Sequence, residues 1–258
     1  MKGFTVQEVT FRYGIQTALD RVTLKLAAGR FYGILGPNGS GKSTLLDLLT
    51  GFRRPEQGRV DLDGRDIGGY GGRELARRIC LVPQNFYIQF PYRVEEVVMM
   101  GRYPHIPRFA APAPDDRRTV ADVMARTGVA EFAGRTVTEL SGGERQRVVF
   151  ARALAQAAPH LLLDEATASM DIRHALDFLK LAARGVGEKG HTVVAVFHDL
   201  NLAAAFCDYL VFLKAGRVAA QGPTEEVLTG PTIQQVFEVQ ARVYRDDYVG
   251  ARQVALKR

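Results

Sequence analysis

The sequence has few cysteines and no long hydrophobic run, which argues against a disulfide-rich protein and against a membrane-spanning protein. Its two cysteines, Cys80 and Cys207, lie in apolar stretches with no other metal-ligating residues clustered nearby. We therefore expect two core residues rather than a disulfide framework or a metal site. No stretch approaches the roughly 18 apolar residues needed to cross a bilayer. The opening residues, MKGFTVQEVTFRYG, lack the apolar core of a signal peptide, which predicts a cytoplasmic protein.

The composition is otherwise that of a soluble globular protein, with 258 residues, 47% hydrophobic and 24% charged. Its 34 basic and 28 acidic residues give a net charge of +6. The arginines, some in pairs, are typical of a solvated surface, but they also suit nucleic acid or an anionic membrane surface. Charge alone does not choose among these three.

Strand-like segments alternate with helix-like segments along most of the chain, which predicts an α/β fold with a mainly parallel sheet. Between residues 86 and 144 the predicted secondary structure becomes mainly helical. The connector GRYPHIPRFAAPAP in this region holds four of the eleven prolines. We interpret residues 1–258 as a single domain. Its core comprises residues 1–85 and 145–258, and residues 86–144 form an inserted helical subdomain.

A glycine-rich run, GPNGSGKST, joins a predicted strand to a predicted helix and matches the pattern G-x-x-x-x-G-K-[ST]. Glycines let backbone N–H groups approach phosphate oxygens, and a helix N-terminus favours negative charge. Lys42 would reach the β- and γ-phosphates, Ser43 would ligate Mg²⁺, and Thr44 would contact the α-phosphate. The predicted phosphate-binding residues are Gly36, Pro37, Asn38, Gly39, Ser40, Gly41, Lys42, Ser43 and Thr44.

The stretch HLLLDE places two carboxylates at the end of an apolar strand. Ligands bind at the carboxyl ends of strands in α/β sheets. Asp164 is therefore a candidate to hold Mg²⁺, directly or through water. Glu165 follows where the chain turns, and it could polarise a water that attacks the γ-phosphate.

The stretch LSGGERQ, Leu140 to Gln146, resembles the signature sequence of ATP-binding cassette (ABC) proteins. Ser141 is a good helix cap, and Gly142 and Gly143 would expose backbone N–H groups to an anion. The resemblance implies an ABC ATPase fold: a P-loop core with N-terminal antiparallel strands and the inserted helical subdomain. It also implies a head-to-tail dimer of two copies, in which each signature closes on the ATP held by the other copy.

Four further residues match functional positions of the family. Tyr13 matches the aromatic residue that stacks on adenine, and Gln84 matches the glutamine that senses the metal. Asp171 matches the aspartate that contacts the opposite subunit, and His198 matches the switch histidine on the γ-phosphate. The resemblance thus implies ATP and Mg²⁺ as cofactors, Ser43, Gln84 and Asp164 around the metal, and Glu165 and His198 as catalytic residues.

The sequence departs from the family pattern at three positions. Ala166 stands where the family usually has proline, Met170 replaces the commoner leucine, and Glu144 occupies a variable place in the signature. None of these changes removes a polar group that the chemistry needs, so we expect an active ATPase.

Three classes of protein could use ATP with these motifs. A P-loop enzyme acting on a small molecule would not need the signature. An ABC ATPase of DNA repair or the ribosome usually adds coiled coils or a second cassette. We therefore expect the energy-coupling subunit of a transporter, with two transmembrane permease subunits as partners and no nucleic acid. It would lie peripherally on the cytoplasmic face of the inner (plasma) membrane.

The stretch MGRYPH, Met100 to His105, and residues 198–222 look like the importer ATPases for iron–siderophore complexes, haem and cobalamin. Such importers also involve a periplasmic or extracellular substrate-binding protein. The aromatic residues Tyr87, Phe90, Tyr92 and Tyr103 would either line a groove for a helix of the permease or pack the helical core.

Overall fold

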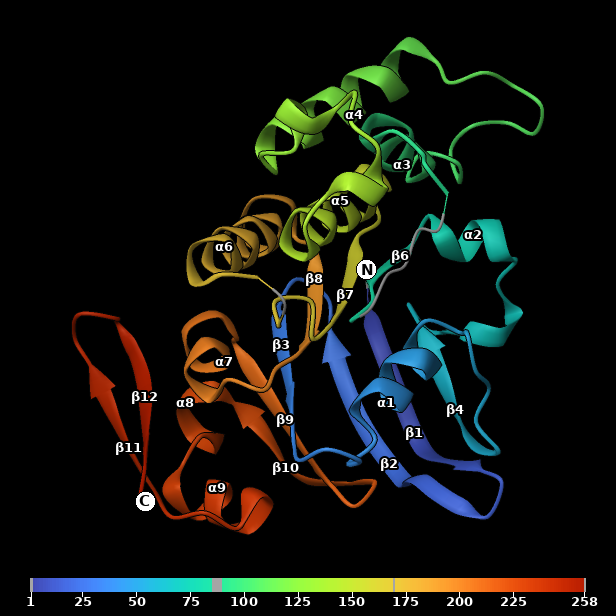
Figure 1. Cartoon of the computed structure of the whole chain (residues 1–258). Helices are drawn as coiled ribbons and strands as arrows, with labels where there is room; N and C mark the ends of the chain where they lie inside the picture. Colours follow the sequence, from blue (N-terminus) through green and yellow to red (C-terminus); the bar gives the residue numbers. More distant parts are fainter. Residues whose placement is uncertain (1, 85–89, 169, 258) are drawn as a thin grey trace. The chain divides into compact units, whose positions relative to one another are not determined.

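The computed structural model describes residues 2–84, 90–168 and 170–257 (Figure 1). The chain folds as two compact units. The first unit comprises Met1–Tyr70 and Ala183–Arg258, and the second comprises Gly71–Ala182. Helix α6, Ile172–Lys189, begins in the second unit and ends in the first.

The first unit opens with an antiparallel sheet. Strand β1 (Gly3–Tyr13) pairs with β2 (Gln16–Ala27) on one side and with β4 (Gln57–Leu62) on the other. The short strand β5 (Arg65–Asp66) pairs with β4. Phe4 and Val6 of β1 are fully buried. The two residues are two positions apart, so their side chains lie on the same, buried face of the strand.

The other strands of the first unit are mainly parallel. Strand β3 (Phe31–Leu35) pairs in parallel with β8 (Thr192–Val196) and with β9 (Tyr209–Lys214), and β10 (Arg217–Pro223) pairs antiparallel with β9. Every residue of β3 and β8 is buried, as expected for parallel strands whose sequences are continuous apolar runs. The α/β fold with antiparallel N-terminal strands and a mostly parallel sheet is therefore confirmed.

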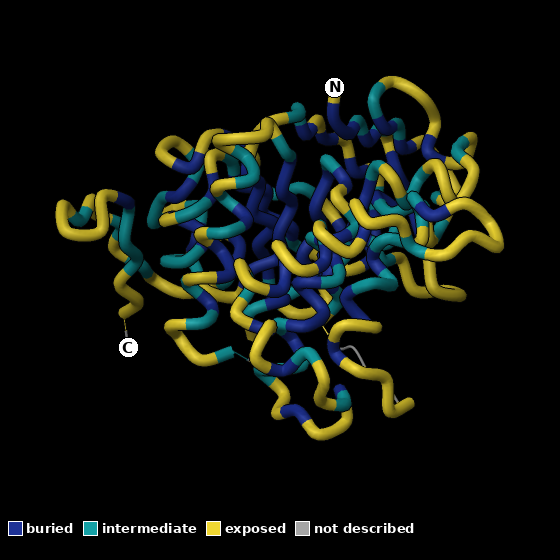
Figure 2. The backbone as a smooth tube through the Cα atoms, turned by 90° about the horizontal axis from the view of Figure 1, so that it is seen from above, coloured by how far each residue is buried: buried dark blue, intermediate teal, exposed yellow. Residues whose placement is uncertain are grey.

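Short helices complete the first unit. Helix α1 (Lys42–Leu49) ends at the cap residue Thr50, and Gly51 follows with φ 70°, the left-handed conformation in which glycine commonly ends helices. The chain finishes in an antiparallel strand pair, and the tube near the C-terminus is largely exposed (Figure 2). The remaining elements of this unit are α1 (Lys42–Leu49), the 3₁₀ turn η1 (Ile67–Gly69), α7 (Leu200–Phe206), α8 (Thr224–Val227), α9 (Gly230–Phe237), β11 (Ala241–Asp246) and β12 (Ala251–Leu256).

The second unit contains one parallel strand pair, β6 (Ile79–Val82) and β7 (His160–Asp164), preceded by helix α2 (Gly72–Ala76). Cys80 lies buried on β6, and burial raises the pKa of its thiol to about 12. Both Cys80 and Cys207 are buried and free of disulfides, which confirms their interpretation as core residues.

Three helices of the second unit share a hydrophobic core: α3 (Val94–Met100), α4 (Pro114–Arg126) and α5 (Gly142–Ala155), with the 3₁₀ turns η2 (Ala130–Phe132) and η3 (Val137–Glu139). Their buried residues recur at helical spacing, as an amphipathic helix requires. The core consists of Val94, Val97, Val98, Val120, Val123, Met124, Val129, Phe132, Val137, Leu140, Val148, Ala151 and Ala155.

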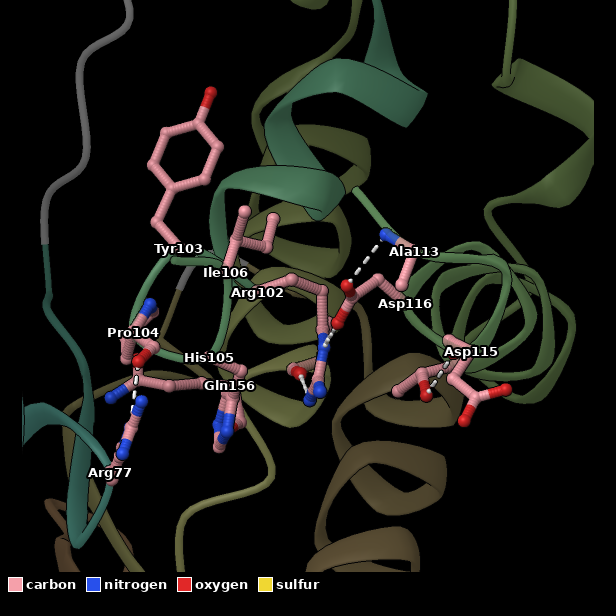
Figure 3. Close-up of polar contacts among 12 residues, drawn as sticks. Arg77, Arg102, Tyr103, Pro104, His105, Ile106, Ala113, Asp115, Asp116 and Gln156 are labelled. Atoms are coloured by element: carbon pink, nitrogen blue, oxygen red, sulfur yellow. Dashed lines mark hydrogen bonds and ion pairs between the residues drawn. The ribbon is translucent and has the colours of Figure 1, made fainter. Parts of the chain in front are cut away.

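A polar junction fastens these helices at the MGRYPH segment (Figure 3). The Arg102 guanidinium lies 2.9 Å from the Asp116 carboxylate of α4, and their side chains are only 13% and 10% exposed. Arg102 also donates to the backbone oxygen of Ala155, at the end of α5, over 2.8 Å. Asp116 in turn accepts from the Ala113 backbone N–H over 3.0 Å. One arginine thus joins the ends of three helices.

The rest of the segment is held by backbone oxygens. Pro104 O accepts from Arg73 Nε at 2.9 Å and from Arg77 Nε at 2.7 Å. His105 Nε2 lies 2.8 Å from Gln156 O. The Gln156 amide also donates to the carbonyls of the last residue of α2 and the first residue of β6. The segment therefore connects α3 to α2, α5 and β6.

Replacing Asp116 with asparagine should destabilise the protein by about 1.5–3 kcal/mol at neutral pH, the usual worth of a hydrogen bond to a charged group. The asparagine amide would place a donor against the Arg102 guanidinium. The control is Asp115→Asn, because Asp115 pairs with Arg118 through side chains 81% and 76% exposed, and such surface pairs contribute about 0–1 kcal/mol. Urea unfolding of both variants beside the parent measures the difference, and equal losses would contradict the assignment.

The Arg102 hydrogen bond also holds the pKa of Asp116 below its usual range. A carboxyl group with a lowered folded pKa stabilises fully above its unfolded pKa of about 3.9. That stabilisation is lost as the pH falls through the folded value. The gap in unfolding free energy between the parent and Asp116→Asn should therefore be full at neutral pH and shrink below about pH 4.

Candidate functional site

The predicted phosphate loop lies between β3 and α1, in the strand–loop–helix order that its sequence predicts. Gly36, Gly39 and Gly41 have φ values of 153°, 77° and 99°, a region that side chains with a Cβ rarely adopt. A Cβ on Gly36 would lie 2.2 Å from Leu213 O, and one on Gly41 would lie 2.6 Å from Ala18 O. Gly36 and Gly41 are therefore required both by their backbone conformation and by the close packing around them, and Gly39 by its backbone conformation alone.

Lys42 is the first residue of α1 and is only 5% exposed. Its ammonium group donates to Gly36 O at 2.9 Å and to Pro37 O at 3.0 Å, so it folds back over the loop. The Ser40 hydroxyl is buried and has no hydrogen-bond partner within the described parts of the chain. A loop with a lysine ammonium, an unsatisfied hydroxyl and left-handed glycines fits an anionic ligand such as a phosphate group.

Two other predicted site residues lie near this loop in the first unit. Tyr13 ends β1, is 43% exposed and places its hydroxyl 3.4 Å from Thr44 Oγ1. His198 is exposed and follows β8, which pairs with β3 up to Ile34 and Val196. Because neighbouring parallel strands end at one edge of a sheet, His198 and the phosphate loop share that edge.

In the second unit, the structure brings Gln84 and Glu165 together. Parallel strands β6 and β7 pair Val82 with Leu163, so the residues two positions further along each chain are neighbours. The Gln84 amide donates a hydrogen bond to the Glu165 carboxylate. Asp164, the last residue of β7, immediately precedes Glu165.

Glu165 has a φ of 48°, in the left-handed region, and its carbonyl accepts from the Ala168 N–H at 3.0 Å. The chain therefore turns directly after β7. Residues other than glycine in this conformation cluster at functional sites, where the surroundings hold them. The turn directs the Glu165 carboxylate toward Gln84.

The signature stretch begins α5, and Ser141 caps it. The Ser141 hydroxyl accepts from the Glu144 N–H at 3.3 Å, and the Glu144 carboxylate accepts from the Ser141 N–H at 2.7 Å. The hydrogen bond from the Ser141 backbone N–H to the carboxylate lowers the pKa of Glu144. Ser141 and Gly142 are exposed, which leaves this helix N-terminus open to solvent.

The family pattern marks Glu144 only as a variable position, whereas the structure gives it a role in this capping box. The spacing S-x-x-E was the signal that could have revealed it. Gln146 was missed as well: it is 5% exposed, and its amide donates to Pro83 O at 3.3 Å, next to Gln84.

Asp171 caps the start of α6. Its carboxylate accepts from the His174 N–H at 2.9 Å and lies 2.7 Å from His174 Nδ1. These two hydrogen bonds lower the pKa of Asp171. His174, which the sequence did not single out, therefore orients the side chain predicted to contact a second subunit.

The candidate residues thus form two groups. The first unit holds the phosphate loop with Tyr13 and His198, and the second unit holds Gln84 with Asp164 and Glu165. Within the described residues, no group of three or more His, Cys, Asp or Glu side chains could hold a metal ion. No helix among the same residues is both long enough and apolar enough to span a membrane.

This chain belongs to the ABC transporter family, whose family model matches residues 19–168. ATP-binding subunits of this family hydrolyse ATP. The resemblance noted from the phosphate loop and the signature is therefore confirmed.

Its curated relatives are ATP-binding proteins of import and transport systems. The chain is 46% identical to the cobalamin import ATP-binding protein of Halobacterium salinarum over 90% of its length, and it spans 58% of that protein. It is 46% identical to the hemin import ATP-binding protein of Bradyrhizobium diazoefficiens, covering 92% of this chain and 89% of the relative. It is 39% identical to the ferric enterobactin transport ATP-binding protein of Escherichia coli, covering 95% and 90%.

Solved structures of ABC proteins also resemble this chain. A chain from a transporter assigned to the metal-chelate type of ABC transporters, in an inward-facing conformation, matches with a TM-score of 0.85 and 30% identity. The match covers 100% of this chain and 97% of the other. The dimeric cassette MJ0796, bound to ADP and phosphate after hydrolysis, matches with a TM-score of 0.75 and 31% identity over 86% and 98% of the two chains.

Proposed function

We propose that this protein is the ATP-hydrolysing subunit of an importer for iron–siderophore complexes, haem or cobalamin. The observation that carries the ATP part is the phosphate loop, with its left-handed glycines and the buried Lys42 ammonium. The named import systems of the relatives support the cargo class. The protein would work peripherally at the cytoplasmic face of the inner membrane, and the single domain of residues 1–258 would comprise the core and the helical subdomain outlined from the sequence.

In the proposed reaction, the base of ATP stacks on Tyr13 and its phosphates bind to Gly36–Thr44. Ser43, Gln84 and Asp164 would hold Mg²⁺, which neutralises charge on the β- and γ-phosphates when it is bound. Glu165 accepts a proton from the attacking water.

His198 is proposed to orient that water against the γ-phosphate, and Ser141, Gly142 and Gly143 of a second copy to close over the nucleotide. Asp171 would contact the second copy. A dimer that closes on ATP and opens after hydrolysis would then drive two permease subunits, which in turn receive cargo from a substrate-binding protein outside the membrane.

A groove in the second unit is the proposed docking site for a helix of the permease. It is a cavity of about 600 Å³ whose lining includes Tyr92, Met99, Met100, Tyr103, Ala121 and Met124. Methionines adapt their shape to a partner, and aromatic residues are enriched at interfaces.

The aromatic residues expected at this groove divide into three cases. Tyr92 and Tyr103 line the groove and are 41% and 59% exposed, which favours a docking surface over core packing. Phe90 is 66% exposed and is not among the lining residues. Tyr87 lies outside the described residues, so its role stays a prediction.

Capture of membrane partners tests this function. The tagged protein, recovered from solubilised membranes of its own source, should bring down a polytopic membrane protein and a substrate-binding protein, identified by mass spectrometry. Ala121→Arg should lose them, because its side chain would fill the groove. Ala125→Arg is the matched control, since Ala125 is also exposed on α4 but does not line the groove.

Recovery of ribosomes or DNA-repair factors without a membrane protein would overturn the transport function and favour a soluble ABC ATPase. Equal capture by Ala121→Arg and Ala125→Arg would keep the importer and reject this groove. Thermal unfolding of both variants checks that each remains folded.

A further inference from the structure

Arg53 lies among three aromatic rings in the first unit, in the segment that follows α1. Its guanidinium carbon is 4.8 Å from the centre of the Tyr13 ring, 5.6 Å from that of Phe11 and 5.7 Å from that of Phe52. Each distance is within the roughly 6 Å range of a cation–π interaction. The shortest of the three is to the ring that is proposed to carry the nucleotide base.

A carboxylate fixes the guanidinium in this place. Arg53 Nε lies 3.0 Å from Asp47 Oδ2, and the Arg53 backbone N–H donates to Asp47 O at 3.3 Å. The two side chains are 36% and 30% exposed. Asp47 belongs to α1, the helix that begins with the phosphate loop. Arg53 therefore connects the phosphate-binding helix to the Tyr13 ring.

The Tyr13 ring is held on its other sides as well. The Phe11 ring meets it edge to face, with centroids 5.1 Å apart and an angle of 80° between the planes. The Tyr13 hydroxyl points toward Thr44 Oγ1. Phe11 thus packs against the Tyr13 ring, Thr44 lies next to its hydroxyl, and the Arg53 guanidinium lies over the ring. These contacts fix the plane of the ring, while 43% of Tyr13 stays exposed.

We propose that Arg53 is a positioning residue for the nucleotide base. It supports the Tyr13 ring so that a purine stacks on the exposed side at a fixed distance from the phosphate loop. This inference rests on the proposed ATP site. Because Arg53 acts through Tyr13, its effect belongs to the nucleoside part of the ligand and not to the phosphates.

The physical gain is preorganisation. A ring that is already ordered loses less side-chain freedom when the base binds, and a cation over an aromatic ring adds a modest attraction. Together these effects predict that Arg53→Ala weakens nucleotide binding about three- to ten-fold. The turnover number at saturating ATP should not change, so the loss should appear as a higher KM.

The test compares ADP with inorganic pyrophosphate, two ligands that differ by the nucleoside, in calorimetric titrations of the full-length protein. Arg53→Ala should weaken ADP binding and leave pyrophosphate binding unchanged. Arg54→Ala is the matched control, because it removes the same charge from an exposed neighbouring residue. A Tyr13→Ala variant and the Tyr13→Ala, Arg53→Ala double variant complete a double-mutant cycle, which measures whether the two side chains act together.

If Arg53 acts through the ring, its replacement has no further effect in the Tyr13→Ala background. Three results would overturn the proposal: unchanged or tighter ADP binding by Arg53→Ala, an equal loss for pyrophosphate, or an equal loss in Arg54→Ala. If Tyr13→Ala itself binds ADP as the parent does, the base-stacking role of Tyr13 fails and the Arg53 inference fails with it. Loss of pyrophosphate binding in a Lys42→Ala variant tests the phosphate loop separately.

Discussion

Glu165→Gln is expected to lower the rate of ATP hydrolysis by about 100-fold or more, the usual cost of losing a general base. ATP binding should survive, because Glu165 is proposed to act on water and not on the nucleotide. Steady-state ATPase measurements and ATP titrations on the same preparation give both quantities.

The structure explains why glutamine is the informative replacement. Gln84 donates a hydrogen bond to the Glu165 carboxylate, and a glutamine oxygen at this position can accept the same bond. Glutamine also has nearly the same shape, so it adopts the left-handed turn at no greater cost than glutamate does. The replacement removes the negative charge of the carboxylate and, with it, the ability to accept a proton.

Glu188→Gln serves as the control, because it removes the same charge from an exposed residue of α6. The ATP-bound form of Glu165→Gln should also accumulate as a dimer, since the step that reopens it is blocked. Normal hydrolysis by Glu165→Gln would show that another group activates the water.

The phosphate loop could be predicted from the sequence because all of its determinants are local. The strand before it, the glycines within it and the helix after it are contiguous, and each has its own sequence pattern. The three left-handed glycines then follow from the loop, although the backbone oxygens that exclude a Cβ at Gly36 and Gly41 belong to the distant strands β9 and β2.

The pairing of Gln84 with Glu165 could not be derived in the same way. These residues are 81 positions apart, and their contact depends on the register between β6 and β7. A shift of one residue in that register would separate them. Only the resemblance to a family placed both in one site, and the parallel pairing supplies the physical reason for their proximity.

Arg53 shows where composition misleads. Paired arginines read as solvated surface charge, and Arg54 is indeed exposed. Its neighbour lies instead over aromatic rings that arrive from β1. The MGRYPH segment is a second example. In the sequence it shows only a resemblance to importer ATPases, whereas in the structure its Arg102 forms an ion pair with Asp116 of the next helix.

Ser141→Arg is expected to abolish ATP-driven dimerisation while leaving ATP binding by the monomer intact. Ser141 is exposed at the N-terminus of α5, where the second copy is proposed to present its nucleotide. An arginine there would insert a long side chain into the closing interface. Size-exclusion chromatography with light scattering should show a dimer for Glu165→Gln with ATP and a monomer for the Glu165→Gln, Ser141→Arg double variant.

Ser141→Ala separates the interface from the helix cap. Both replacements remove the hydroxyl that accepts from the Glu144 N–H, and losing such a cap costs about 1 kcal/mol. Only arginine adds bulk and charge, so Ser141→Ala in the Glu165→Gln background should still dimerise with ATP. If both replacements abolished the dimer equally, the cap and not the exposed surface would be responsible. A dimer that persists in the arginine variant would show that the signature of α5 does not meet the nucleotide of a second copy.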